Sequence, residues 1–257
     1  MQNTRRRLLH VCIDLEAPFA EGNSVDRADL DRVGDWLIQR VGQYGIPATW
    51  AVADPVHSAV TSRLLSGRVV HELAVLGDRT WVGPAAGRRR FAAELTRRVL
   101  RARAAGLSIS TLATRHELAS DHLDLLVKHG ITALRAHAVP CSPGSRVEAI
   151  GFGLWKFSVH DSLPRPKTWL NPLAGRSIAR RLRRAVQQGP SPVVLIDASG
   201  MSLQGARERR RVDYILNRIA CWSRDDHVRV ETLAQAASRL SAPRPSTPAH
   251  SILRKAV

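Results

Sequence analysis

The 257-residue sequence has few cysteines and no long apolar run. Its three cysteines show neither the paired spacing of a disulfide framework nor the spacing of a zinc site, so we expect reduced thiols. No window approaches the roughly 18 consecutive apolar residues of a membrane-spanning helix. The apolar run that follows Arg5, Arg6 and Arg7 is too short for a secretory signal. We therefore expect a cytoplasmic protein without a membrane span.

Acidic residues are also scarce relative to basic ones. The chain has 22 acidic and 39 basic residues, a net charge of +17, and only four of the basic residues are lysine. This charge favours an anionic partner such as nucleic acid or an acidic polymer. However, no nucleic-acid recognition motif and no series of stacking aromatic residues accompanies it. We therefore expect that the charge reflects a compositional preference for arginine and that nucleic acid is the less favoured partner. Binding of an anionic polymer is kept as an alternative.

Apolar strands alternate with amphipathic helices along most of the chain. Strands are predicted over residues 8–13, 47–53, 68–76, 107–113, 131–134, 193–196 and 228–230. Helices are predicted between them, over 56–65, 88–105, 118–129 and 206–222, and others end near residues 45, 188 and 240. Strands separated by helices are parallel and joined by right-handed crossovers. The pattern therefore predicts an α/β fold, a distorted barrel of seven or eight β/α units.

This barrel is predicted to span residues 1–240, with a disordered basic tail over 241–257. A stretch rich in Pro, Gly and Ser, 137–172, is expected to be a long excursion in which only 155–159 resembles a strand. An open doubly wound sheet is the alternative architecture. No Gly-rich phosphate loop follows the first strand, which disfavours a nucleotide-binding version of that alternative.

Two acidic residues stand where the first strand ends. Asp14 and Glu16 are two residues apart, so in an extended chain both side chains point to the same face. The carboxyl ends of the strands are where β/α barrels carry their active sites. A functional pair of carboxylates is one interpretation. The alternative is a structural ion pair with Arg115 or Arg135.

Several segments between residues 8 and 240 resemble the polysaccharide deacetylase family. Its NodB-type homology domain is a distorted β/α barrel that removes acetyl groups from carbohydrates. The similar segments are Val11-Cys12-Ile13-Asp14-Leu15-Glu16, Gly45-Ile46-Pro47-Ala48-Thr49-Trp50, His71-Glu72-Leu73-Ala74, Leu123-Asp124-Leu125-Leu126 and Val228-Arg229-Val230-Glu231-Thr232-Leu233. The third resembles the His-Glu-Ile-Gly that opens the family's metal motif.

The resemblance implies a divalent metal held by a carboxylate and two histidines, with a carboxylate base and a histidine acid. Asp14 stands in the base position. The two metal histidines correspond to Leu76 and Thr80, neither of which binds a metal, and the late strand that carries the acid ends here in Asp197. Arg115 lies in the altered arginine motif and is placed to pair with Asp14. The candidate catalytic residues are Asp14, Glu16, Arg115 and Asp197.

Other residues near the predicted strand ends supply further candidates. Three histidines follow the second, fourth and fifth strands, namely His57, His116 and His137. A rearranged zinc-like site made of Asp14, Glu16, His116 and His137 is one hypothesis, and ordinary loop histidines are the alternative. The candidate substrate-binding residues are Asp78, Trp81 and Arg135. Trp81 either stacks on a sugar ring or fills the emptied metal pocket, and His71 is expected to be structural.

From the sequence we favour a deacetylase-like protein whose catalytic activity is absent or altered. We expect it to act on or bind a carbohydrate or a small anionic ligand through the barrel cleft. One alternative is an active metal-dependent deacetylase of an N- or O-acetylated sugar that uses the rearranged site. The other is a basic protein that binds an anionic polymer. A divalent metal cofactor is expected only in the first alternative.

Overall fold

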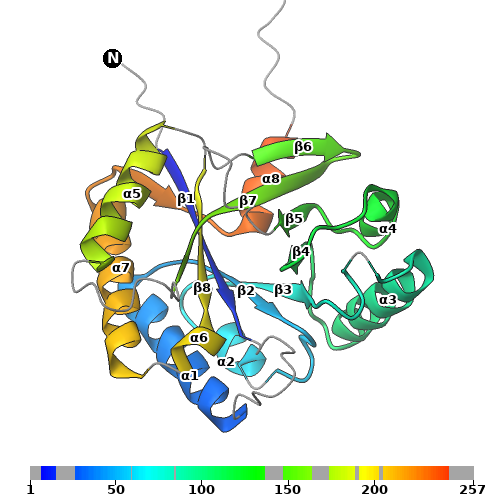
Figure 1. The fold of residues 1–257 in the computed structure, drawn as a ribbon, viewed down its shortest axis with the longest axis horizontal. Coiled ribbons are helices and arrows are strands. Elements are labelled where there is room, and N and C mark those ends of the chain that lie inside the picture. The colour runs from blue at the N-terminus through cyan, green and yellow to red at the C-terminus, as the bar shows by residue number, and fades with distance from the viewer. Residues whose placement is uncertain are drawn as a thin grey trace, which may run out of the picture.

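The structure is a computed structural model that describes residues 7–15, 27–58, 60–83, 85–136, 147–163, 174–188, 191–202 and 205–242. At its centre, seven parallel strands form a closed ring (Figure 1). These are β1 (Arg7–Asp14), β2 (Thr49–Val52), β3 (Glu72–Gly77), β4 (Thr111–Thr114), β5 (Ala133–Ala136), β7 (Leu154–Leu163) and β8 (Val193–Asp197). The ring closes because β1 pairs with both β8 and β2. The predicted β/α barrel is confirmed, and the open sheet is excluded.

Two further strands extend the ring. β9 (Val228–Val230) pairs with residues 7–9 of β1, whereas β2 pairs with residues 12–14 of the same strand. β6 (Val147–Gly151) lies antiparallel to β7 outside the ring. β1 is therefore shared between two neighbours along one edge, which is one source of the barrel's distortion.

Within the predicted excursion over 137–172, the strand-like residues 155–159 belong to a strand, which is longer than predicted. Residues 154–163 form β7, a strand of the ring with neighbours on both sides. Polar residues interrupt its apolar pattern, and one of them, Asp161, is buried and paired with Arg181 at 3.0 Å. A buried charged residue interrupts the apolar pattern by which a strand is predicted, so the full length of this strand was not recognised. The flanking segments 137–146 and 164–173 lie outside the described residues.

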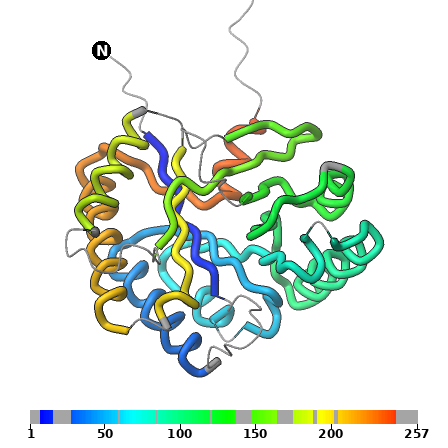
Figure 2. Tube along the Cα trace, viewed as in Figure 1, coloured from blue at the N-terminus to red at the C-terminus, as the bar shows by residue number. Residues whose placement is uncertain are grey.

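Helices surround the ring, and the elements of the fold run to Ser241. They are α1 (Arg27–Tyr44), α2 (Thr61–Leu65), α3 (Arg88–Ala104), the 3-10 turn η1 (Ser120–His122), α4 (Leu123–Lys128), α5 (Ala174–Gln188), α6 (Ala198–Ser202), α7 (Ala206–Arg224) and α8 (Leu233–Ser241). Figure 2 shows α5 beside α7 on one side of the barrel and α3 with α4 on the other. None of the helices described is long and apolar enough to cross a bilayer. Most of the predicted tail, 243–257, lies outside the described residues.

The two faces of each strand form separate cores, because side chains alternate along a strand. Leu9, Val11 and Ile13 of β1 point outward and pack in the main apolar cluster beneath the helices. Inside the ring, the alanines of three neighbouring strands and Leu76 form a small cluster of their own. Because these alanine side chains are small, they leave room at the carboxyl end of the ring for the larger polar side chains described below.

Helix α8 closes the amino end of the ring. Its first turn is held by the buried carboxylate of Glu72, which accepts hydrogen bonds from the Ala234 N–H at 2.9 Å and from Thr49 Oγ1 at 2.8 Å. Thr111 Oγ1 donates to the second carboxylate oxygen. A carboxylate is favourable at a helix N-terminus, where backbone N–H groups lack helical partners. The Glu72 of the deacetylase-like motif therefore serves the fold at the amino end of the barrel.

Buried His10 makes the stability of the fold sensitive to acid. Its Nδ1 donates a hydrogen bond to the Glu231 carbonyl at 2.8 Å, and its Nε2 is buried with no partner among the described residues. Burial lowers the pKa of His10 to about 4 from a usual 6.5. The unfolded chain therefore binds this proton more tightly than the folded chain, so the stabilisation is complete above pH 6.5 and is lost as the pH falls towards 4.

We expect this linkage to remove about 2 kcal/mol of stability between about pH 7 and about pH 5. Urea unfolding of the parent and of His10→Gln at both pH values measures it. The variant should lose less stability on acidification by about that amount. An identical pH dependence in both proteins would show that another group is responsible.

Candidate functional site at the carboxyl end of the barrel

Four charged side chains meet where the parallel strands end. Asp14 ends β1, Asp197 ends β8, Arg135 lies in β5 and Arg115 follows β4. Asp14 and Asp197 are register partners, and both point into the ring because each is two residues beyond an inward-facing side chain. We call these four residues the mouth network. The sequence predicted all four as candidates for this end of the barrel.

Asp14 and Arg135 form a two-pronged ion pair. Arg135 Nη1 lies 2.6 Å from Asp14 Oδ1, and Arg135 Nη2 lies 3.0 Å from Asp14 Oδ2. The exposed fraction is 0% for Asp14 and 1% for Arg135. Parallel N–H···O bonds between a guanidinium and a carboxylate are among the strongest polar contacts in proteins. Both oxygens of Asp14 therefore accept a hydrogen bond from Arg135.

Arg115 connects the two carboxylates. Its Nε lies 3.4 Å from Asp14 Oδ2, and its Nη2 lies 3.3 Å from Asp197 Oδ1. Asp197 also accepts hydrogen bonds from the backbone N–H and the hydroxyl of Ser199, at 3.1 and 2.7 Å. The side chains of Arg115 and Asp197 are 18% and 29% exposed. A molecule in the mouth of the barrel therefore meets these two residues before the buried pair.

Burial raises the pKa of the Asp197 carboxyl, the charge of Arg115 opposes this shift, and the charge of Asp14 adds to it. A raised pKa is what an aspartate needs in order to act as a proton donor near neutral pH. The shift alone assigns no such role, because an ion-pair network also perturbs pKa values.

The metal site that the resemblance implies does not fit these residues. Leu76 is buried among Ala51, Ala74 and Ala113, and exposed Thr80 donates hydrogen bonds from its backbone N–H and hydroxyl to Asp78. Neither position offers a nitrogen or carboxylate ligand, and Asp14 presents both oxygens to Arg135 instead. No reaction step through a metal follows from this arrangement.

The rearranged metal set lies only partly within the described residues. His116 is half-buried and His57 is exposed, while Glu16 and His137 lie outside the described residues. No group of three or more His, Cys, Asp or Glu side chains positioned for a metal occurs among the residues described. The four-residue set therefore stays a prediction.

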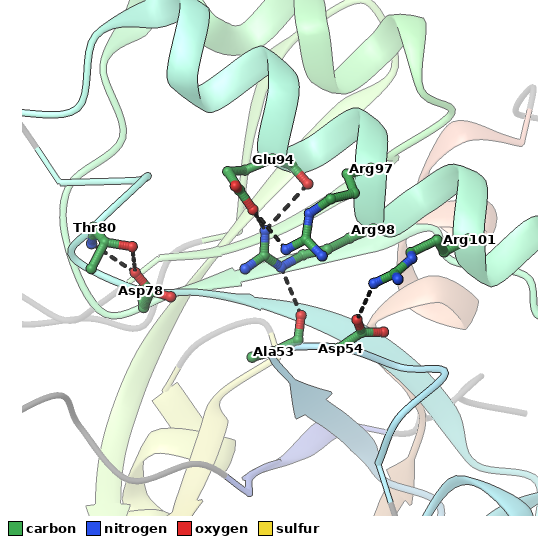
Figure 3. A network of polar contacts seen from close by, with 8 residues as sticks. All are labelled: Ala53, Asp54, Asp78, Thr80, Glu94, Arg97, Arg98 and Arg101. Carbon is green, nitrogen blue, oxygen red and sulfur yellow. Dashed lines mark hydrogen bonds and ion pairs between the residues drawn. The ribbon is translucent and has the colours of Figure 1, made fainter.

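Trp81 packs beneath α3. Its ring is buried, its centre lies 5.6 Å from that of Phe91, and the Arg98 guanidinium lies over it at 4.7 Å. Arg98 donates from Nε to the Ala53 carbonyl at 2.8 Å and also contacts Glu94 (Figure 3). This burial disfavours stacking on a sugar. It places Trp81 in the apolar cluster beneath the helices, separate from the cluster of Leu76 inside the ring, so filling of the metal pocket stays a prediction.

Asp78 stabilises the loop after β3 by accepting a hydrogen bond from the Thr80 N–H at 2.7 Å, whereas Arg101 of α3 reaches Asp54, which follows β2, at 3.2 Å (Figure 3). Gly77 is required here, because a Cβ at this position would lie 2.3 Å from Cγ2 of Val82. Asp78 therefore shapes the loop, and its predicted contact with a substrate stays a prediction.

His71 has the surroundings of a structural residue. Its Nδ1 accepts a hydrogen bond from the Ala48 N–H at 3.3 Å, and its ring meets Trp50 edge-on at 5.8 Å between centroids. Burial lowers the pKa of His71 to about 4. The ring is therefore neutral near pH 7, as expected for a structural histidine.

The sequence analysis missed two contributors to this end of the barrel. Ser199 holds Asp197 in place, and the signal was a serine two residues after an aspartate, a spacing typical of local side-chain to backbone turns. Arg98 lies on the buried face of α3, three residues after Leu95, and this spacing was the signal that could have separated it from the exposed arginines of that helix.

No family model matches the sequence, and no curated protein matches it. Solved structures do match the fold. A structure from Mycobacterium smegmatis assigned to the polysaccharide deacetylases is 16% identical, with a TM-score of 0.64 over 94% of this chain and 93% of that one. A family 4 acetyl xylan esterase from Clostridium thermocellum, in complex with a cobalt ion, is 13% identical, with a TM-score of 0.53 over 92% and 93%.

A third match is a mutant of a CE4 family pseudoenzyme with restored enzymatic activity. It is 8% identical, with a TM-score of 0.56 over 91% of this chain and 68% of that one. Identities this low establish the fold alone. The seven-stranded ring and these matches together show that the chain has the NodB-type fold of the polysaccharide deacetylases.

Proposed function

We propose that this protein binds a carbohydrate or a small anionic ligand at the mouth network and has no metal-dependent deacetylase activity. The observation that carries the proposal is the ion pair of Asp14 with Arg135. A carboxylate that serves as a base or a metal ligand needs a free lone pair directed at its partner. Here both oxygens of the corresponding carboxylate accept hydrogen bonds from one guanidinium.

The ligand-binding part of the proposal rests on Arg115 and Asp197. Arg115 offers guanidinium donors and Asp197 a carboxylate acceptor, both partly exposed above the buried pair. Such groups suit the hydroxyls of a sugar or the carboxylate of an acidic sugar. Several proteins with the same fold are described by their action on carbohydrates, including the acetyl xylan esterase and a 4-alpha-glucanotransferase from Thermococcus litoralis.

Calorimetric titration with chitin-derived and xylan-derived oligosaccharides, neutral and acidic, tests the proposal. We expect Arg115→Gln to weaken binding by about tenfold or more, because a hydrogen bond to a charged group contributes about 1.5–3 kcal/mol. Arg101→Gln, which removes an arginine paired with Asp54 outside the ring, is the matched control and should bind as the parent does. Equal affinities of both variants would place the ligand elsewhere.

The active deacetylase with a rearranged site is the competing proposal. It requires Asp14 to leave Arg135 and to meet Glu16 and His137. Release of acetate from acetylated xylan or chitin oligosaccharides, measured with added zinc, separates the two. We expect no release above that of Asp14→Ala, whereas zinc-dependent release that this substitution abolishes would favour the deacetylase.

A further inference from the structure

Helix α5 is basic far beyond what its place in the fold requires. It has five arginines and no acidic residue, and the flanking chain from residue 164 to residue 192 contains no aspartate or glutamate. Ile178, Leu182 and Val186 are buried and attach the helix to the barrel. The exposed arginines of α5 are therefore not needed to hold the helix in place.

Three of these arginines form a row. Arg176, Arg180 and Arg184 recur every four residues, so they share one face of α5 at intervals of about 6 Å along the axis. Like charges at this spacing disfavour a helix slightly. Within the described part of the chain, no ion pair involves any of the three. Together they line a groove of about 420 Å³ with Ser177 and Arg181.

Arg181 shows what an arginine of α5 does when it serves the fold. It donates from Nη2 to buried Asp161 of β7 at 3.0 Å, which ties the helix to the ring. Among the described residues no carboxylate pairs with the row, and Arg176, Arg180 and Arg184 are exposed to solvent. A chain of anionic groups would neutralise the row, and guanidinium groups bind phosphates through paired N–H donors.

We propose that this groove binds the phosphodiester backbone of a single-stranded nucleic acid. An aromatic ring stands at the start of the row, because exposed Tyr214 of α7 lies against Gly175, 3.3 Å from the position of a Cβ there. Proteins that bind single strands combine a basic groove with aromatic side chains on which bases stack. A groove along one helix suits a single strand better than the wide cylinder of a duplex.

A membrane surface fits the same charges less well. Helices that bind bilayers insert an apolar face, and the apolar face of α5 is already buried against the barrel. Its exposed positions are polar, namely Arg176, Ser177, Arg180, Arg183, Arg184 and Gln187.

Fluorescence anisotropy with a labelled oligothymidylate of about 12 nucleotides tests the proposal. Binding should weaken from about 50 to 200 mM salt, with a slope of log K against log salt near about −2 for three contacted phosphates. Arg176→Gln/Arg180→Gln/Arg184→Gln should lose at least about tenfold in affinity, with a flatter slope. Glutamine keeps the helix propensity of arginine, and circular dichroism checks that the variant is folded.

The matched control removes three exposed arginines elsewhere, as Arg68→Gln/Arg89→Gln/Arg90→Gln. Arg89 and Arg90 begin α3, on the far side of the barrel from α5 (Figure 1). This control should bind nearly as the parent does. Equal losses in both triple variants would overturn the assignment of the groove, as would the absence of salt-dependent binding by the parent.

Two further probes decide the nature of the ligand. Tyr214→Ala should weaken oligothymidylate binding several-fold, as expected for one lost stacking contact, and leave binding of inorganic polyphosphate unchanged. No change for either probe would overturn the assignment to a nucleic acid. Tighter binding to phosphatidylserine vesicles than to the oligonucleotide would overturn it in favour of a membrane surface.

Discussion

Replacing Arg135 with alanine is expected to lower the free energy of unfolding by about 3–5 kcal/mol, the range for breaking a buried ion pair. The variant leaves the carboxylate of Asp14, which is 0% exposed, without its two strongest donors. Arg115 remains at 3.4 Å, a longer contact that replaces only part of the loss. Urea unfolding at about pH 7 measures the effect directly.

The double variant Asp14→Asn/Arg135→Met supplies the control. It removes both charges and keeps side chains of similar size, so it should recover most of the loss. Asp14→Asn alone leaves Arg135 buried without its carboxylate and should be destabilised more than the double variant. A loss below about 1 kcal/mol in Arg135→Ala would mean that the pair behaves like a surface ion pair, contrary to the structure.

Restoring the two missing histidines is expected to create a zinc site only if Arg135 is removed as well. The resemblance places the histidines at Leu76 and Thr80 and puts Asp14 in the base position. Asp14 is also the described carboxylate at the end of β1 that we expect to be able to join them. In Leu76→His/Thr80→His, Arg135 still occupies both oxygens of Asp14. The triple variant with Arg135→Met frees the carboxylate, and three protein ligands with an open position match a catalytic zinc site.

Zinc titration followed by thermal unfolding tests this expectation. In the triple variant, zinc at about 1,000 times its dissociation constant should add about 4 kcal/mol of stability. The double variant and the triple variant with added Asp14→Ala should gain much less. Equal zinc affinity in the double and triple variants would show that Arg135 does not hold Asp14 away from a metal.

The alternation of strands and helices was enough to predict the barrel, because apolar outward faces such as that of β1 repeat along the chain. β7 was recognised only in part, because Lys156, His160 and Asp161 interrupt its apolar residues. Asp161 is buried only because Arg181 of α5 meets it, and a contact between elements distant in the sequence leaves no local pattern.

The candidate site could be predicted as a set of residues but not as a set of contacts. The position of Asp14 at a strand end identified the mouth of the barrel, and both Arg115 and Arg135 were expected partners. The choice of Arg135 as the main partner depends on which strands face each other across the ring, since β1 and β5 are not neighbours in the sheet. That Leu76 and Thr80 offer no metal ligand was visible from the residue types alone.

The central claim is that the ion pair with Arg135 keeps the Asp14 carboxylate from acting as a base or as a metal ligand. Metal content per chain, measured on protein purified without chelator and after equilibration with zinc, tests it most directly when the parent is compared with Asp14→Ala. We expect the same low content in both, because the guanidinium of Arg135 neutralises the charge of Asp14 and hydrogen-bonds to both of its oxygens. One bound metal per chain in the parent, absent from Asp14→Ala, would contradict the claim.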